Sequence, residues 1–206
     1  MAEGTSLFGA DNKYMYLKIL DILFILTGTF YEKIVGLFYN YINKIVTKEN
    51  ITFLNYGLAH LDKEYKSTNN SDFFCSLLYK YLLDRAKIKD KKTLDVGCGL
   101  GGGALLLKKN YYAEEVYGID ISSRNIQFCQ RKYNDIAGMR FFKASASDIP
   151  FQDNFFDIVT NVESSHNYSN ILRYYKEVHR VLRPSGVFLY TDFFMFSDIS
   201  KVKKKI

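Results

Sequence analysis

The 206-residue sequence lacks the features that mark several classes of protein. It has no tryptophan, only two prolines and three cysteines, and the cysteines stand far apart with no CxxC pair. Neither a disulfide framework nor a zinc site is indicated, and we expect a reducing, cytoplasmic setting. The three histidines show no HExxH spacing, so no metal site is expected. Because 48% of the residues are hydrophobic, a disordered or fibrous chain is excluded.

An uninterrupted hydrophobic run long enough to span a bilayer is also missing. Residues 14–31 are strongly apolar, but Lys18 and Asp21 interrupt them, whereas a spanning helix needs about 20 mostly apolar residues. No small-residue cleavage site follows, so a secretory signal is not expected. For residues 14–46 two interpretations stay open. We favour burial against the domain or a partner, and the alternative is peripheral contact with a membrane surface.

A basic stripe is absent as well, although the formal net charge is +6. Four of the lysines stand together in a terminal run, at positions Lys201, Lys203, Lys204 and Lys205. Such a run is typical of a solvated tail. Nucleic acid is therefore not expected as a partner.

The patterns that are present divide the chain into four parts. We expect a polar leader (1–13), an N-terminal helical segment (14–90), a core (91–195) and a basic tail (196–206). Within the helical segment, apolar residues recur at helical spacing at Ile34, Val35, Phe38, Ile42, Ile45 and Val46. A second helix is predicted over Ser71–Ala86, with Ser71 as its N-cap, and a short extended piece turns at Asn55-Tyr56-Gly57.

From Lys91 onward, strand and helix signals alternate. Strand-like apolar runs stand at Thr93–Val96, Val116–Ile119, Met139–Phe142, Phe156–Thr160 and Val187–Thr191. Helical patterns fill the gaps, notably at Ser123–Tyr133 and Asn170–Leu182, and Arg183-Pro184-Ser185-Gly186 is predicted to form a turn. Five strands alternating with helices predict an α/β fold with a mostly parallel sheet covered on both faces.

A glycine-rich loop follows the first of these strands. Gly97, Gly99 and Gly102 satisfy the dinucleotide fingerprint GxGxxG, so the loop alone also fits a dinucleotide. A turn that binds nothing is not expected with so many glycines between a strand and a helix. The charge of Asp95 separates the two ligands, because a carboxylate at the end of the strand repels a pyrophosphate but attracts a cation. We therefore expect a cationic ligand.

An acidic residue ends the second strand. Asp120 lies about 20 residues beyond the loop, where a carboxylate can accept hydrogen bonds from both hydroxyls of a ribose. Ile121 would then pack on the face of an adenine. The alternative role for Asp120 is a helix cap, for which Ser122 is the better candidate.

Further motifs follow in a fixed order along the chain. They read Leu94-Asp95-Val96-Gly97-Cys98-Gly99-Leu100-Gly101, Gly118-Ile119-Asp120, Ile149-Pro150-Phe151, Phe156-Asp157-Ile158-Val159 and Val181-Leu182-Arg183-Pro184-Ser185-Gly186. In this combination the sequence resembles the class I S-adenosylmethionine-dependent methyltransferases. The resemblance implies a Rossmann-like sheet, and S-adenosylmethionine as the cationic ligand. Its sulfonium and ammonium groups would lie near Asp95.

A narrower resemblance is to the phthiotriol/phenolphthiotriol dimycocerosate-type methyltransferases, which O-methylate a lipid alcohol. It rests on Phe53-Leu54-Asn55-Tyr56-Gly57, Gly101-Gly102-Gly103-Ala104, Cys129-Gln130-Arg131 and Glu163-Ser164-Ser165-His166-Asn167-Tyr168, and covers roughly residues 31–195. It implies a small or lipid-like hydroxyl acceptor.

The resemblance also implies the residues that hold the methyl donor. They are Asp95, Gly97, Gly99 and Gly101 around its methionine part, Asp120 and Ile121 at the nucleoside, and Ser145, Ala146, Asn161 and Tyr56 around them. In the family an Asp usually follows the third strand and accepts from the adenine amino group. Ser145 stands there in this sequence, with Asp148 three residues on. A neutral hydroxyl is a weaker acceptor than a carboxylate.

Polar residues after the fourth and fifth strands suggest the chemistry of transfer. His166 has the pKa range of a general base, and Asp192 could orient its imidazole. Glu163 completes the predicted catalytic set; its alternative roles are substrate binding or capping of the next helix. The alternative for His166 is a loop histidine that bonds only backbone groups.

Two rival functions remain, a nicotinamide-dependent oxidoreductase and a non-catalytic binding module built on the same fold. The second gains weight because only 15 residues follow Thr191. The superfamily sheet normally adds two strands and a helix there, which need about 25–30 residues. We therefore expect that the fifth strand is covered by a second copy, a partner or the N-terminal helices, or that C-terminal sequence is missing.

Overall fold

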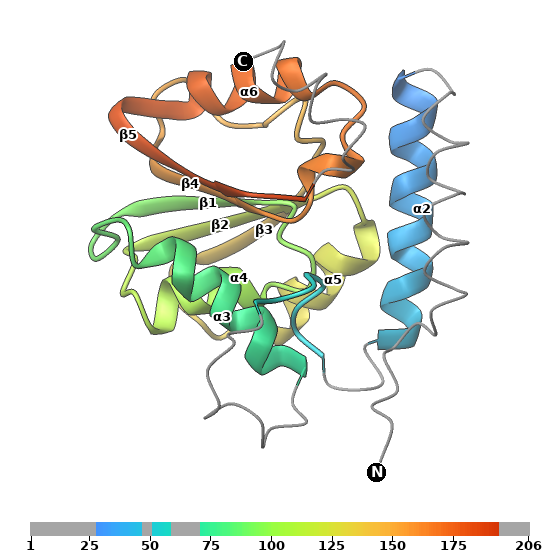
Figure 1. Cartoon of the computed structure of the whole chain (residues 1–206), viewed down its shortest axis with the longest axis horizontal. Coiled ribbons are helices and arrows are strands. Elements are labelled where there is room, and N and C mark those ends of the chain that lie inside the picture. The colour runs from blue at the N-terminus through green and yellow to red at the C-terminus, as the bar shows by residue number, and fades with distance from the viewer. Residues whose placement is uncertain (1–27, 47–50, 59–70, 194–206) are drawn as a thin grey trace.

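The computed structural model describes residues 28–46, 51–58 and 71–193 (Figure 1). The helices are α2 (Gly28–Val46), α3 (Ser71–Leu83), α4 (Gly102–Lys109), α5 (Ser123–Lys132), the 3-10 turn η3 (Ser165–Asn167) and α6 (Ile171–Val181). The strands are β1 (Lys92–Val96), β2 (Glu115–Asp120), β3 (Met139–Lys143), β4 (Phe156–Val162) and β5 (Leu182–Thr191).

The five strands form one parallel sheet in the order β3-β2-β1-β4-β5. β1 lies at its centre, where Thr93 is in register with Val116 of β2 on one side and Ile158 of β4 on the other. The predicted α/β fold with a parallel sheet is therefore confirmed. Since all strands run the same way, their carboxyl ends meet at one edge of the sheet.

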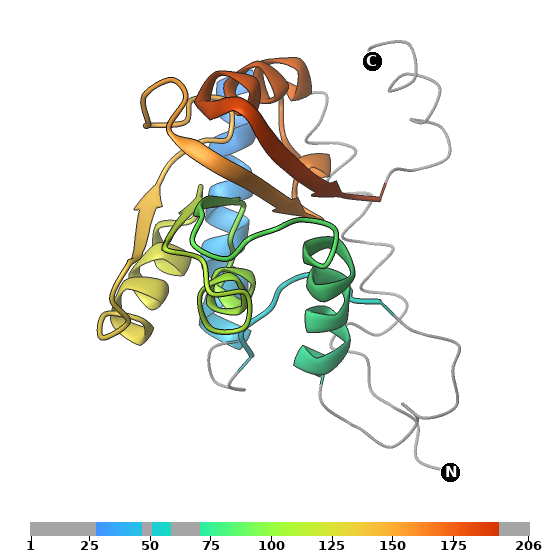
Figure 2. The same ribbon diagram turned by 90° about the vertical axis from the view of Figure 1, so that its left-hand side faces the viewer.

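Helices cover both faces of this sheet. Figure 1 shows α6 on one face and α3, α4 and α5 on the other, and Figure 2 shows the same two layers from the side. Successive residues of a strand point to opposite faces. Ile158 accordingly packs with the α3–α5 side of the core, whereas Val159 packs with the α6 side. Both side chains are almost fully buried.

The fifth strand differs from its prediction. We expected Arg183–Gly186 to be a free turn before a strand at Val187, but β5 begins at Leu182. Leu182 is in register with Phe156, and Val187 is in register with Ile158. Between these two pairs β5 has four residues where β4 has one. The four residues between Leu182 and Val187 therefore bulge out of the strand, and Ser185 within them adopts a positive φ of 66°. The residues predicted to form a turn before the strand therefore form a bulge within it.

Helix α2 lies across the carboxyl edge of the sheet, outside both layers, as the blue helix of Figure 1 shows. Its predicted apolar face is confirmed for Val35 and Ile42, which are buried, while Leu37 is 67% exposed. Two polar residues of α2 also point toward the sheet edge. Asn40 accepts from the Ser122 hydroxyl at 2.8 Å, and Asn43 donates to Asn125 at 3.1 Å.

Several predictions fall outside the described residues. These are the polar leader, the apolar stretch 14–27 and the lysine-rich tail. Within residues 28–46, 51–58 and 71–193, none of the helices combines the length and the hydropathy that crossing a bilayer requires.

Candidate active site

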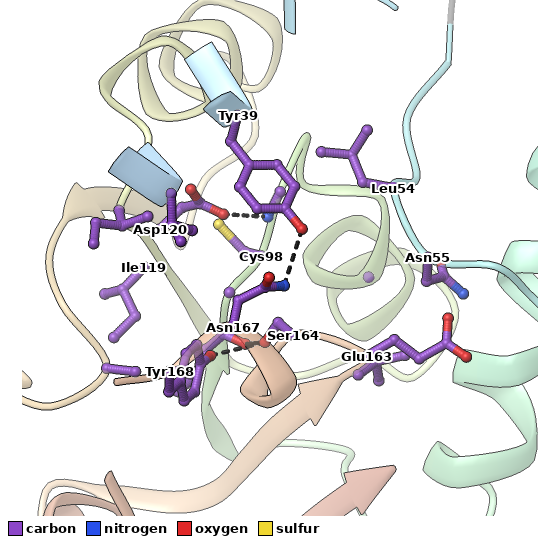
Figure 3. Close-up of a pocket in the computed structure, with 18 of the residues that line it drawn as sticks. Tyr39, Leu54, Asn55, Cys98, Ile119, Asp120, Glu163, Ser164, Asn167 and Tyr168 are labelled. Atoms are coloured by element: carbon purple, nitrogen blue, oxygen red, sulfur yellow. Dashed lines mark hydrogen bonds between the residues drawn. The ribbon is translucent and has the colours of Figure 1, made fainter. Parts of the chain in front are cut away.

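A cavity opens between α2, the segment 51–58 and the carboxyl ends of β1, β2, β3 and β4 (Figure 3). Its empty volume is about 850 Å³, including the part open to solvent. Ligand sites of α/β sheets lie at this edge, and cavities of several hundred Å³ hold small molecules. Its lining includes Val35, Tyr39, Phe53, Leu54, Val96, Gly97, Gly99, Ile119, Asp120, Ile121, Ala144, Ser145, Ala146, Val162, Glu163, Ser164, Asn167 and Tyr168.

The glycine loop forms one wall of the cavity. Gly97 and Gly99 have positive φ values of 71° and 54°, and a side chain at Gly97 would clash with Ser164. Gly101 also has a positive φ but does not line the cavity, because it faces Tyr133 and Cys129. Of the three glycines predicted to hold the ligand, Gly97 and Gly99 line the cavity and Gly101 does not; Gly102 and Gly103 line it as well.

The backbone N–H groups of this loop are already bonded within the protein. Gly97 and Cys98 both donate to the carbonyl of Ile119, at 2.8 and 3.0 Å. The same holds for Gly99, which donates to Asp120 Oδ2, for Gly101, which donates to Cys98, and for Gly102, which donates to Thr52. A pyrophosphate would need free donors at this place. The N–H groups of Gly97, Cys98, Gly99, Gly101 and Gly102 are therefore not free to bind a pyrophosphate.

Asp120 lines the cavity, as predicted, and its carboxylate is held from three sides. It accepts from the N–H groups of Gly99 (2.9 Å) and Ser122 (2.8 Å) and from the amide of Asn125 (3.3 Å). Burial raises the pKa of Asp120 to about 6, against the opposite effect of these hydrogen bonds. The helix-cap role belongs to Ser122, whose hydroxyl accepts from Asn125 N at 3.1 Å and caps α5. Asp120 is therefore not the N-cap of α5, and its carboxylate lines the cavity.

Asp95 lies behind the cavity wall and is fully buried. Its Oδ1 accepts from the Thr160 hydroxyl at 2.8 Å. Burial raises the pKa of Asp95 to about 7, while the hydrogen bond from Thr160 acts in the opposite direction. Among the ion pairs of the described residues, none involves Asp95, which agrees with burial as the main cause of the raised pKa.

The loop after β3 brings Ser145 and Ala146 to the cavity, as predicted. The hydroxyl of Ser145 accepts from the N–H of Ser147 at 3.1 Å and donates to Glu32 of α2 at 3.0 Å. Asp148, the carboxylate three residues after Ser145, is exposed and does not line the cavity.

Asn161 is fully buried and does not line the cavity itself. Its amide donates to the carbonyl of Val96 (3.0 Å) and to the hydroxyls of Ser164 (2.8 Å) and Tyr168 (2.9 Å). Ser164 and Tyr168, which are 2.7 Å apart, do line it. Asn161 thus fixes two cavity residues to the end of β1.

The predicted base and its partner are brought together. His166 Nδ1 lies 2.7 Å from Asp192 Oδ1, and Asp192 Oδ2 accepts from the Ser165 hydroxyl (2.5 Å) and the His166 N–H (3.0 Å). Neither His166 nor Asp192 lines the cavity. The other ring nitrogen, Nε2, lies 2.7 Å from the amide nitrogen of Asn167, and that amide also donates to the Tyr39 hydroxyl at 3.1 Å. Asn167 therefore stands between His166 and the cavity.

Glu163, the third predicted catalytic residue, lines the cavity directly. It has a positive φ of 48°, and its carboxylate accepts from the N–H of Tyr56 at 2.6 Å. Burial raises the pKa of Glu163. Tyr56, the predicted cover, is 54% exposed and lies outside the lining, while its neighbours Leu54 and Asn55 line it. The predicted cover is therefore formed by the residues just before Tyr56.

Several lining residues escaped the sequence prediction, above all Glu32 and Tyr39 of α2. The sequence holds one weak indication of a special role for Glu32, because it is the only acidic residue in the sequence of α2. No pattern in the sequence indicates that α2 reaches the sheet edge.

The charge of the cavity is of one sign. Its described lining includes the carboxylates of Glu32, Asp120 and Glu163 but no lysine, arginine or histidine. An anionic ligand would meet repulsion here, and a cationic one attraction.

Comparisons with known proteins agree on one family. Residues 94–190 match the family described as "Methyltransferase domain". The chain is 39% identical over 159 residues to a fatty-acid O-methyltransferase of Mycolicibacterium smegmatis, which covers 76% of this chain and 58% of the relative. It is 32% identical over 174 residues to a probable phthiotriol/phenolphthiotriol dimycocerosates methyltransferase of Mycobacterium ulcerans, covering 83% and 67%. The chain thus spans about three fifths to two thirds of these relatives' lengths.

Solved structures share the fold. A geranyl diphosphate methyltransferase in complex with GPP and sinefungin superimposes with a TM-score of 0.66 at 20% sequence identity, over 78% of this chain and 65% of that one.

Proposed function

This chain belongs to the S-adenosylmethionine-dependent methyltransferases, and on that basis we propose that it transfers a methyl group to an oxygen of a lipid-like acceptor. The observation that carries the proposal is the acidic cavity at the sheet edge, whose described lining has three carboxylates and no cation. S-adenosylmethionine carries a sulfonium and an ammonium against one carboxylate, and the carboxylates of such a site stabilise its net positive charge.

The residues present fit this donor. Gly97 and Gly99 place bare backbone in the cavity wall, and Asp120 presents a carboxylate for the ribose hydroxyls. The pKa values of Asp95 and Asp120 are both raised by burial, so a bound cation would stabilise both carboxylates. When bound, the donor supplies an activated methyl group on a sulfonium; this chain's residues hold it and exclude water.

The rival dinucleotide function is disfavoured by the same features. A pyrophosphate carries negative charge into a cavity lined by carboxylates. It would also find the N–H groups of Gly97, Gly99 and Gly102 already bonded to protein oxygens. A nicotinamide-dependent oxidoreductase is therefore not proposed.

The acceptor we propose is a hydroxyl on an apolar chain. The cavity lining also includes the apolar side chains of Val35, Phe53 and Leu54. The two curated relatives are named for fatty-acid and phthiotriol-type lipids, which supports a lipid-like acceptor. A neutral hydroxyl enters a cavity of negative charge more easily than a fatty-acid carboxylate does.

A hydroxyl must lose its proton during transfer, and for this we propose His166 oriented by Asp192. With Asp192 accepting from Nδ1, the ring nitrogen Nε2 is the basic site. Asn167 donates to Nε2 at 2.7 Å, so this amide must turn aside before an acceptor reaches the imidazole. Glu163 is the second candidate base, since it lines the cavity without such a screen.

Calorimetric titration with S-adenosylmethionine and a methyl-transfer assay test this function. We expect binding by the full chain, weaker binding by at least about tenfold in Asp120→Asn, and transfer to a long-chain alcohol in preference to a fatty acid of equal length. His166→Ala should retain donor binding but lose transfer by about 100-fold or more, whereas the exposed His179→Ala serves as control. Absence of donor binding would contradict the proposal. Binding without transfer to either acceptor would favour the non-catalytic module.

A further inference from the structure

Glu32 links helix α2 to two loops at the carboxyl edge of the sheet. Its Oε2 accepts from the hydroxyl of Ser145, after β3, at 3.0 Å. Its Oε1 accepts from the hydroxyl of Ser169, after β4, at 2.8 Å. Because the two serines fix both oxygens, the carboxylate is held in one orientation at the cavity that it lines.

The hydroxyl of Ser145 is already committed at this corner. A serine hydroxyl carries one proton and two lone pairs. The proton is donated to Glu32, and one lone pair accepts from the N–H of Ser147. A carboxylate has about four lone-pair sites, of which these serines occupy two on Glu32. The strongest acceptor left for a ligand at this corner is therefore Glu32, not Ser145.

The position of the corner indicates which part of a ligand reaches it. Asp120 ends β2 and Ser145 follows β3, its neighbour in the sheet. A nucleoside with its ribose at Asp120 extends its base past Ile121 toward the β3 side. The lining there includes, beside Ser145 and Ser147, the residues Ile121, Ala144 and Ala146, whose small or apolar side chains suit the faces of a flat ring. A carboxylate at the rim of such a slot accepts from a ring substituent that donates.

We propose that Glu32 accepts a hydrogen bond from the exocyclic amino group of the adenine and thereby selects adenine over a base with a carbonyl at that position. This inference rests on the proposed binding of S-adenosylmethionine. The specificity follows from the chemistry, because a carboxylate has only acceptors and repels the carbonyl oxygen of hypoxanthine. The N-terminal helix, rather than the loop after β3, then supplies the charged acceptor for the base.

The ratio of two affinities tests this role. Calorimetry would compare S-adenosyl-L-homocysteine with S-inosyl-L-homocysteine, in which a carbonyl replaces the amino group and the adjacent ring nitrogen N1 carries a proton. We expect the wild-type chain to prefer the adenosyl compound by about 10- to 100-fold. Glu32→Gln keeps the shape but adds an N–H₂ donor, so this preference should fall at least about tenfold.

Asn40→Ala is the matched control. Asn40 also ties α2 to the sheet edge, through the Ser122 hydroxyl (2.8 Å) and the Arg124 N–H (3.1 Å), but does not line the cavity. If Glu32 served only to hold α2 in place, both variants would weaken both compounds equally and leave the ratio unchanged, which would overturn the inference. Thermal unfolding of each variant without ligand shows whether it is folded. If Glu32→Gln is not folded, Glu32→Asp replaces it, with the same expected fall in preference because its shorter carboxylate withdraws from the base.

The result separates this inference from the function on which it rests. If the wild-type chain binds neither compound, the proposed function and the inference both fail. If it binds the adenosyl compound, loses it in Asp120→Asn and keeps its preference in Glu32→Gln, the inference alone fails.

Discussion

Two carboxylates, Asp95, which is fully buried, and Asp120, which lines the cavity, are the most informative residues of this chain. Asp95 and Asp120 end adjacent strands, and burial raises the pKa values of both. A carboxyl group buried without a cation costs stability as soon as it ionises. Residues of this kind are typical of sites that bind a charged ligand. A cationic ligand bound nearby would offset the loss of stability that ionisation of these two groups causes in the free protein.

Asp95→Asn should therefore stabilise the free protein while weakening donor binding. The folded protein holds a proton on Asp95 up to about pH 7, whereas the unfolded chain releases it near pH 4. The free energy of unfolding thus falls as the pH rises between these values. Near pH 8 the Asn variant should be more stable than the wild type by about 1 kcal/mol or more, and near pH 4 the two should agree.

Urea unfolding at both pH values measures this difference. Exposed Asp135→Asn is the charge-matched control and should leave stability within about 0.5 kcal/mol at either pH. An Asp95→Asn variant less stable than the wild type near pH 8 would show that Asp95 has a stabilising partner when ionised.

At the scale of elements, α2 forms one side of the cavity. It contacts the segments after β2, β3 and β4 through Asn40, Glu32 and Tyr39 respectively. Gly36 lets the helix approach closely, because a Cβ there would lie 3.5 Å from the carbonyl oxygen of Ile121. That distance is ordinary contact for a methyl group and too short for a larger side chain.

The effect of a substitution at Gly36 should therefore depend on the size of the new side chain. Gly36→Ala fits and should stabilise the protein by about 0.5–1 kcal/mol, because alanine favours helix. Gly36→Leu should push α2 from Ile121 and weaken S-adenosylmethionine binding at least about tenfold. Thermal unfolding and calorimetry measure both effects, with the 67% exposed Leu37→Ala as control for binding. Unchanged affinity in Gly36→Leu would mean that α2 does not close the donor site.

At the scale of the whole molecule, one sheet supports two cores. The cluster with α3, α4 and α5 includes Leu107, and the cluster with α6 includes Val178. Both clusters take side chains from the same strands. If the helices on one face came away, the strands that the other cluster packs against would therefore be destabilised as well. The cavity lies at the edge where both layers and α2 meet (Figures 1 and 3).

Unfolding should accordingly be cooperative. Leu107→Ala should cost about 2–5 kcal/mol and Val178→Ala about 1–3 kcal/mol, each lowering the midpoint of one common transition. Circular dichroism and tyrosine fluorescence, followed through the same denaturant titration, should coincide. Leu172→Ala, on the exposed face of α6 at 43% exposure, should change little. Separate transitions for the two substitutions would show that the layers unfold independently.

The sequence by itself determined the sheet and the glycine-loop side of the site. Strand and helix periodicity is local, so β1 to β4, α5 and α6 were predicted to within one or two residues at each end. Asp120, Gly97 and Gly99 were found because a strand–loop–helix unit places them at the sheet edge whatever surrounds it. His166 and Asp192 were paired because adjacent parallel strands end at the same edge.

Only the tertiary structure decided what lies opposite that loop. Whether α2 crosses the sheet edge depends on contacts more than 80 residues apart in sequence, such as the bond of Asn40 to Ser122, and no local pattern encodes them. Burial also redistributed the predicted roles. Asp95 and Asn161 lie behind the cavity wall, Asn167 screens His166, and the hydroxyl of Ser145 donates to Glu32. Which polar group faces a cavity is set by packing, and packing is a property of the whole fold.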